Sequence, residues 1–202
     1  SRTIGVVVYD FRDPYFGTII EKLQASAHEQ NYSLVLAGFK GRHPEASDLA
    51  PLHKHAIDGL IVLGSSERSE WLAGFRSMPV VRIGQGEPDE PVVRVSIDEN
   101  LAAEQILDHL VSKGWKHVAF IGSNLFVHAI RFQALERAAE TRPVQLERYV
   151  WASDGFEAGL QATRGIDQEM ALVCATDVIA MGALHALHDS GKKLPVTGFD
   201  DI

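Results

Sequence analysis

Short apolar runs rich in β-branched residues recur along the chain and alternate with segments of helical periodicity. The runs occupy residues 4–9, 33–38, 59–64, 80–84, 92–97, 117–122, 149–152, 170–175 and 196–199. Most of them are apolar at nearly every position, which is typical of parallel strands that are covered on both faces. Because strands and helices alternate, the sequence predicts an α/β fold with right-handed crossovers and a doubly wound, mostly parallel sheet.

Helix starts can be located from the residues that directly follow some of these runs. Asp13 is a suitable N-cap before Pro14, and apolar residues then recur at helical spacing at positions 16, 19, 20 and 23. Asp98 is predicted to open a second helix and Asp177 a third, and a glycine follows the last helical turn of each.

The predicted elements fall into two series, which indicates two lobes. We place the boundary where the helix that carries HLVSKG ends, so that the lobes comprise residues 1–116 and 117–202. Residues 84–91, GQGEPDEP, are predicted to be irregular, and they lack the third glycine and the following helix of a dinucleotide-binding fingerprint.

The composition argues against several classes of function. A formal net charge of −8 argues against direct binding of this segment to a nucleic-acid backbone. The sole cysteine, Cys174, lies in an apolar run, and no apolar run approaches the roughly 18 residues that a membrane span needs. A Gly-x-Ser-x-Gly elbow is absent, and no histidine pair has a carboxylate or cysteine at ligand spacing. We therefore expect no enzymatic activity, no cofactor, no metal and no membrane partner.

The residues that directly follow the predicted strands supply a candidate binding site. In open parallel sheets, ligands bind beyond the carboxyl ends of the strands. The candidates at these positions include Asp13, Tyr15, Phe16, Asp98, Trp151, Thr176 and Asp200, together with other polar residues such as Ser65, Ser66, Gln85, Ser123, Asn124 and Asp177. Carboxylates and hydroxyls can bind the hydroxyl groups of a polyol, and its C–H face packs on an aromatic ring. A nucleobase would also stack on the aromatic residues, so a sugar and a base both stay open. Each candidate also has a structural interpretation, as a helix cap, a core aromatic residue or a solvated turn.

Several stretches, taken in order, carry a family resemblance. They are IGVVVYDFRDPYFGTIIEKLQASAHEQNYSLVLAG, IDGLIVLGS, VSIDENLAAEQILDHLVSKGWKHVAFIG, HAIRFQAL, CATDVIAMGALHAL and VTGFDDI. Along essentially its whole length the chain resembles the effector-binding domain of the LacI/GalR family of bacterial transcription regulators. The resemblance implies a periplasmic-binding-protein-like fold of two α/β lobes with a small-molecule effector held between them. It also implies a cytoplasmic homodimer whose upstream helix-turn-helix domain, which lies outside this chain, binds operator DNA.

The resemblance assigns roles to individual residues. It implies that Asp13, Tyr15 and Phe16 contact the effector from the first lobe. In the second lobe it implies the same for Arg131, for Trp151 as a stacking aromatic, and for Asp200 of the Gly-Phe-Asp-Asp motif. Thr176 stands where the family has asparagine, and Glu99 follows Asp98 at a position where asparagine is usual. The family also continues beyond the position that matches Ile202, so we expect the natural protein to be longer.

Two alternative functions are compatible with the same fold. A periplasmic sugar-binding protein of a transport system shares the two lobes, but such proteins tend to carry Gly-Phe-Asp-Gly where this chain has GFDD. An α/β enzyme that converts a sugar is the other alternative, although the sequence supplies no nucleophile, metal set or cofactor loop for it. A regulator with a sugar or a related polyol as its effector is the preferred interpretation.

Overall fold

The computed structural model describes residues 2–39, 43–66, 68–152 and 154–202, which form two compact units. The first comprises residues 1–97 and the second residues 98–202. The boundary thus precedes helix α3 (Glu99–Ser112), whereas the predicted boundary lies after this helix. The difference has a physical cause, because α3 packs on helix α4 (Phe126–Ala139) of the second unit. Arg142, just beyond α4, donates from Nε to Asp108 of α3 at 2.7 Å, and Arg137 donates from Nη2 to Asn100 at 2.8 Å.

The first unit is built on a five-stranded parallel sheet with the order β2-β1-β3-β4-β5. Its elements are β1 (Thr3–Val8), α1 (Pro14–Glu29), β2 (Ser33–Gly38), α2 (Ala46–Lys54), β3 (Gly59–Leu63), the 3-10 helix η1 (Glu70–Phe75), β4 (Val80–Ile83) and β5 (Val93–Val95).

Successive residues of β1 explain how both faces of this sheet are covered. Val6 and Val8 pack with Phe16 on the face that α1 covers. Val7 points to the opposite face and packs in the cluster that contains Leu52 of α2 and Phe75 of η1. All three valines are fully buried, which accounts for an apolar run without polar alternation.

The second unit repeats the strand order of the first four strands. Its parallel sheet has the order β7-β6-β8-β9, so the first strand of the unit lies between the second and the third, as β1 does in the first unit. The elements that follow α3 are β6 (His117–Ser123), α4, β7 (Gln145–Trp151), α5 (Phe156–Arg164), β8 (Ala171–Cys174), α6 (Asp177–Ser190) and β9 (Val196–Thr197).

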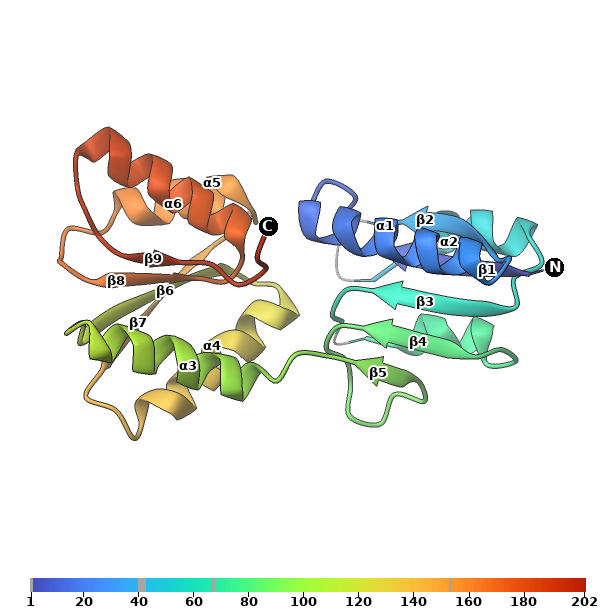
Figure 1. Ribbon diagram of the computed structural model, residues 1–202, viewed down its shortest axis with the longest axis horizontal. Coiled ribbons are helices and arrows are strands. Elements are labelled where there is room, and N and C mark those ends of the chain that lie inside the picture. The colour runs from blue at the N-terminus through green and yellow to red at the C-terminus, as the bar shows by residue number, and fades with distance from the viewer. Residues whose placement is uncertain (1, 40–42, 67, 153) are drawn as a thin grey trace. The chain divides into compact units, whose positions relative to one another are not determined.

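The helices of the second unit form two pairs. Figure 1 shows α3 and α4 on one side of the strands and α5 and α6 on the other. The α5–α6 contact is unusually close. A Cβ atom built on Gly159 would lie 1.9 Å from the carbonyl oxygen of Ile179, and one on Gly182 would lie 1.9 Å from that of Phe156. No side chain other than the hydrogen of glycine fits at either position.

The predicted α/β fold is confirmed. Each predicted strand is present, and the helix that follows Asp13 and Pro14 has Asp13 as its N-cap. The third helix requires a correction, because its N-cap is Thr176 and not Asp177. The Oγ1 of Thr176 accepts from the backbone N–H of Ile179 at 3.3 Å, so the threonine satisfies the first turn.

Candidate functional site

In the first unit, the three predicted site residues lie at the start of α1. Asp13 accepts at Oδ1 from the backbone N–H of Tyr15 at 3.0 Å, as an N-cap does. Tyr15 is half-buried and meets the ring of Phe16 edge to face, with 5.3 Å between the ring centroids. Phe16 is only 7% exposed and belongs to the core between α1 and the sheet. The structure therefore gives Asp13 and Phe16 clear structural roles, and Tyr15 is the more accessible of the two aromatic residues.

In the second unit, Arg131 lies at the centre of a buried ionic cluster. Its Nε atom donates to Oε2 of Glu99 at 3.3 Å, and its Nη1 atom lies 3.7 Å from Oδ1 of Asp200. The same Nη1 donates to the backbone carbonyl of Ala175. The guanidinium carbon lies 4.0 Å from the centroid of the Phe199 ring, at cation–π distance. The start of α3, the loop between β8 and α6, and the segment after β9 thus meet at one arginine of α4.

Asp177 joins the start of α6 to the segment after β9. Its Oδ1 accepts from the N–H of Phe199 at 2.7 Å, and its Oδ2 accepts from that of Ile202 at 2.9 Å. In return its own backbone N–H donates to Oδ2 of Asp200 at 3.2 Å. A Cβ atom on Gly198 would lie 1.7 Å from Oδ1 of Asp177, which explains the glycine of the GFDD motif. These bonds hold Asp200 where it meets Arg131.

Two other predicted residues, Trp151 and Asp98, lie close to the carboxyl ends of strands but outside the Arg131 cluster. Trp151 is the last residue of β7, pairs in register with Ser123 of β6, and is 41% exposed. Asp98 is exposed, and its Oδ1 accepts from the N–H groups of Asn100 and Leu101 at 3.1 and 3.0 Å, so it caps α3. The structure therefore brings Arg131 and Asp200 together, and Arg131 also reaches the carbonyl of Ala175, the residue before Thr176. Asp98 lies outside this cluster and fixes the start of α3.

A buried histidine on α4, His128, lies near Arg131 and was not among the predicted site residues. Nδ1 of His128 accepts from the backbone N–H of Ser123 at 3.0 Å and lies 3.0 Å from its hydroxyl oxygen. Burial, with smaller contributions from Arg131 and Arg148, lowers the pKa of His128 to about 3. The ring is therefore neutral near pH 7, with its proton on Nε2. No sequence motif marks it, because its partner is a backbone amide.

The second residue that the prediction passed over is Glu99. The sequence carried one signal for it, because it occupies the position after Asp98 where the resemblance expects asparagine. Its side chain is 6% exposed and reaches Arg131, which is 32 residues away in sequence. By contrast Cys174 is fully buried, and burial raises the pKa of its thiol, so it is a core residue.

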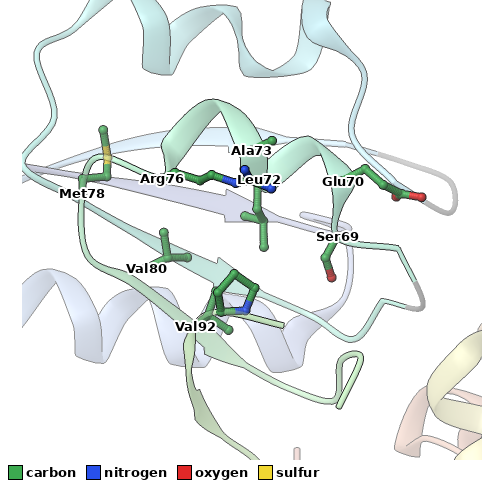
Figure 2. A pocket seen from close by; sticks show the side chains of 9 residues that line it. Ser69, Glu70, Leu72, Ala73, Arg76, Met78, Val80 and Val92 are labelled. Carbon is green, nitrogen blue, oxygen red and sulfur yellow. The ribbon is translucent and has the colours of Figure 1, made fainter. Parts of the chain in front are cut away.

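The first unit also contains a concavity that lies apart from the predicted site residues. Its volume is about 430 Å³, and Figure 2 shows side chains of η1, β4 and the segment before β5 around it. It is lined by Ser69, Glu70, Leu72, Ala73, Arg76, Met78, Val80, Pro91 and Val92. The lining residue Ser69 donates to Oε1 of Glu90 at 2.6 Å, and the completely buried guanidinium of Arg82 is paired with the same carboxylate.

Other classes of site receive no support from the described part of the chain. No helix among the described residues is long and apolar enough to cross a bilayer. The same residues contain no group of three or more histidine, cysteine, aspartate or glutamate side chains that could hold a metal ion.

Comparison with known proteins supports a periplasmic-binding-protein-like fold. Residues 107–202 match the family model described as a periplasmic binding protein-like domain. The chain is 26% identical over 219 residues to the HTH-type transcriptional repressor PurR of Mannheimia succiniciproducens, covering all of this chain and 65% of that protein. It is 27% identical over 218 residues to the HTH-type transcriptional regulator RegA of Clostridium saccharobutylicum, again covering 100% and 65%. The chain therefore spans about 65% of the length of these curated relatives.

Solved structures share the fold at lower sequence identity. A LacI family transcriptional regulator from Enterococcus faecium with bound ribose superimposes with a TM-score of 0.84 at 23% identity, covering 99% of this chain and 78% of that one. The Cra transcriptional dual regulator from Pseudomonas putida, in complex with fructose 1-phosphate, gives a TM-score of 0.79 at 21% identity, covering 99% and 80%. The predicted periplasmic-binding-protein-like fold and the resemblance to the effector-binding domain of LacI/GalR regulators are thereby confirmed.

Proposed function

We propose that this chain, which has the fold and sequence resemblance of a LacI/GalR effector-binding domain, is the sensor of a ligand-responsive transcriptional regulator. The curated relatives are regulators, and the periplasmic transport alternative is therefore not favoured. In this proposal, the effector is a small polar molecule, with a sugar or related polyol as the first candidate and a nucleobase as the second. The chain senses the effector, and a helix-turn-helix domain outside the chain binds operator DNA.

The observation that carries the proposal is the Arg131 cluster at the carboxyl ends of the strands in the second unit. An arginine that is held by Glu99 and Asp200 presents its donors at a defined position. Trp151, at the end of a neighbouring strand, offers an exposed aromatic face to a ligand. In open parallel sheets this edge is where ligands bind. We propose that Arg131, Trp151, Asp200, Thr176 and Asp98 form the second unit's part of the effector site, and that Asp13, Tyr15 and Phe16 form the first unit's part.

The proposed regulator works as a homodimer, and the surface of the second unit is compatible with this. Phe156 of α5 and Met181 and Leu184 of α6 are large apolar side chains that are between 42% and 53% exposed. The two helices that carry them are packed closely together, so the three side chains belong to one rigid pair of helices. We propose that these exposed apolar side chains contribute to a contact between subunits.

Regulation requires that the effector binds one conformation better than another. A coupling free energy of roughly 1 to 3 kcal/mol between the effector and operator sites would change operator affinity about 5- to 150-fold. Effector contacts that involve Arg131 and Asp200 can supply such a difference, because charge-assisted hydrogen bonds depend strongly on geometry.

Isothermal titration against a panel of neutral sugars, polyols and nucleobases tests the proposal. Replacing Arg131 by alanine should weaken the binding of the best ligand by about 10- to 150-fold, since a hydrogen bond to a charged group contributes about 1.5 to 3 kcal/mol. Arg137→Ala is the matched control, because Arg137 lies on the same helix but is bonded to the side chain of Asn100. Far-UV circular dichroism checks that each variant folds. Equal affinity in the Arg131→Ala and wild-type proteins would reject the site, and conversion of the bound sugar into a product would favour an enzyme.

A further inference from the structure

We infer that Glu99 is a specificity-determining residue of the proposed effector site, and that it restricts this site to uncharged ligands by binding and neutralising Arg131. The inference rests on the proposed function, because it describes which ligands the same site accepts. Glu99 was not among the predicted effector contacts, and the proposed function does not specify the charge of the ligand.

The geometry holds Glu99 firmly in place. Glu99 is the first residue of α3, directly after the N-cap Asp98. The two hydrogen bonds from Asn100 and Leu101 to Asp98 fix the first turn of this helix and therefore the direction of the Glu99 side chain. Its carboxylate reaches Nε of Arg131 at 3.3 Å, and both side chains are less than 10% exposed. A buried ion pair of this kind leaves the arginine little freedom to turn toward another partner.

The hydrogen-bond donors of Arg131 are largely committed. A phosphate or carboxylate is bound most strongly when an arginine offers two parallel N–H groups from one edge of its guanidinium. One such edge contains Nε, which donates to Glu99, and the other contains Nη1, which donates to the carbonyl of Ala175 and faces Asp200. Arg131 can therefore offer a single donor group, Nη2, to a hydroxyl or carbonyl oxygen, but it cannot offer an intact two-point fork.

The charge of the cluster leads to the same conclusion. One guanidinium is paired with two carboxylates, Glu99 and Asp200, whose side chains are each 6% exposed. A third carboxylate, Asp177, lies next to Asp200 and is bonded to the backbone of the same segment. The cluster therefore carries a net negative charge in surroundings that screen it poorly. A phosphorylated ligand, with a charge of about −1.5 to −2 near neutral pH, would be repelled, whereas a hydroxyl-rich neutral ligand would not.

A purely structural role for Glu99 makes a different prediction. An acidic residue in the first turn stabilises a helix through its dipole, whatever ligand the protein binds. Removal of its charge would then weaken the binding of neutral and anionic ligands by the same factor, or would leave both affinities unchanged. If Glu99 determines specificity, removal of its charge changes the ratio between the two classes. The ratio of affinities within a matched pair of ligands therefore separates the two roles.

The experiment compares the wild-type protein with Glu99→Gln, which keeps the shape and the hydrogen-bonding oxygen of the side chain and removes its charge. Glu104→Gln is the matched control, because Glu104 is an exposed glutamate on the same helix. The probes are two pairs, fructose with fructose 1-phosphate and ribose with ribose 5-phosphate, titrated calorimetrically at low salt and neutral pH. Melting temperatures are measured in parallel, to show that each variant folds and to detect weak binding of inorganic phosphate.

We expect the wild-type protein to bind the neutral member of a pair roughly 100-fold or more tightly than the phosphorylated member, since like charges brought together in a binding site are strongly unfavourable. Glu99→Gln should narrow this ratio at least about tenfold, and Glu104→Gln should leave it unchanged. A wild-type protein that prefers the phosphorylated member, or an unchanged ratio in Glu99→Gln, overturns the inference while the proposed function stands. If no member of either pair binds to any of the three proteins, the inference is overturned, and the wider panel of sugars, polyols and nucleobases then decides whether the proposed function stands.

Discussion

Acidification should destabilise the second unit through the buried imidazole of His128. In the folded unit, burial lowers the pKa of His128 from 6.5 to about 3, while the unfolded chain keeps the ordinary value. Between these two values the unfolded chain binds a proton that the folded unit does not bind, so stability is complete above pH 6.5 and is lost as the pH falls toward 3. The linkage relation gives a loss of about 2 kcal/mol from this residue between pH 7 and pH 5.

Urea unfolding at the two pH values measures this loss. In a Trp71→Phe background, the tryptophans that remain, Trp115 and Trp151, belong to the second unit and report its unfolding. His128→Asn places an amide oxygen near the position of Nδ1 and removes the titration. The wild-type protein should lose about 2 kcal/mol more than this variant between pH 7 and pH 5. His185→Asn, at a side chain that is 54% exposed on α6, is the control and should behave as wild type. Equal losses in the wild-type and His128→Asn proteins would refute the reasoning.

The remaining predictions concern packing in each unit and can be checked by urea unfolding. Glu90→Ala should destabilise the first unit by about 3–5 kcal/mol, because it leaves the completely buried guanidinium of Arg82 without its carboxylate; a loss below about 1 kcal/mol would show that water reaches the arginine. Gly182→Ala should cost about 1–3 kcal/mol or more, since the added methyl group meets the carbonyl of Phe156. Gly17→Ala, on α1 with open space around the new methyl group, should instead stabilise by up to about 1 kcal/mol, and a destabilisation there would contradict the helix assignment.

The fold could be predicted from the sequence largely because most of the strands are continuous apolar runs. The prediction was less accurate where that signal is weak. Strand β7 begins at Gln145, four residues before its predicted start. The prediction missed the first half of this strand because it is an edge strand and that half carries mostly polar residues. Helix α2 was not assigned, and it contains Pro51, which sequence reasoning takes as a sign against a helix. The boundary between the two lobes was predicted after residue 116 and not after residue 97, because the packing of α3 on α4 leaves no pattern in the local sequence.

The positions of the candidate residues in the fold were predictable, but the bonds between them were not. The rule that ligands bind beyond strand ends depends only on strand positions, and the structure places Trp151 at the end of β7 and Asp200 in the segment after β9. Arg131 was selected through the family resemblance, and no local pattern in the sequence indicates that its side chain is buried. Its surroundings depend on Glu99, which is 32 residues away, and on Asp200, from the opposite end of the unit. A contact between such distant positions cannot be derived from periodicity, because it depends on how the finished elements pack.

The close contact between α5 and α6 has a consequence for how this protein can change over evolution. Gly159 and Gly182 each place a bare Cα against a carbonyl of the facing helix, so the two positions share one narrow gap. A larger residue at either position would fit only if the two helices moved apart. A single substitution does not supply the other changes in packing that such a movement needs. Among homologues that keep this helix pair, both positions should therefore stay small, and a larger residue at one should appear only in sequences where the helix spacing has been altered by other changes. The glycine pair is thus a packing constraint of the second unit, independent of the ligand that any homologue binds.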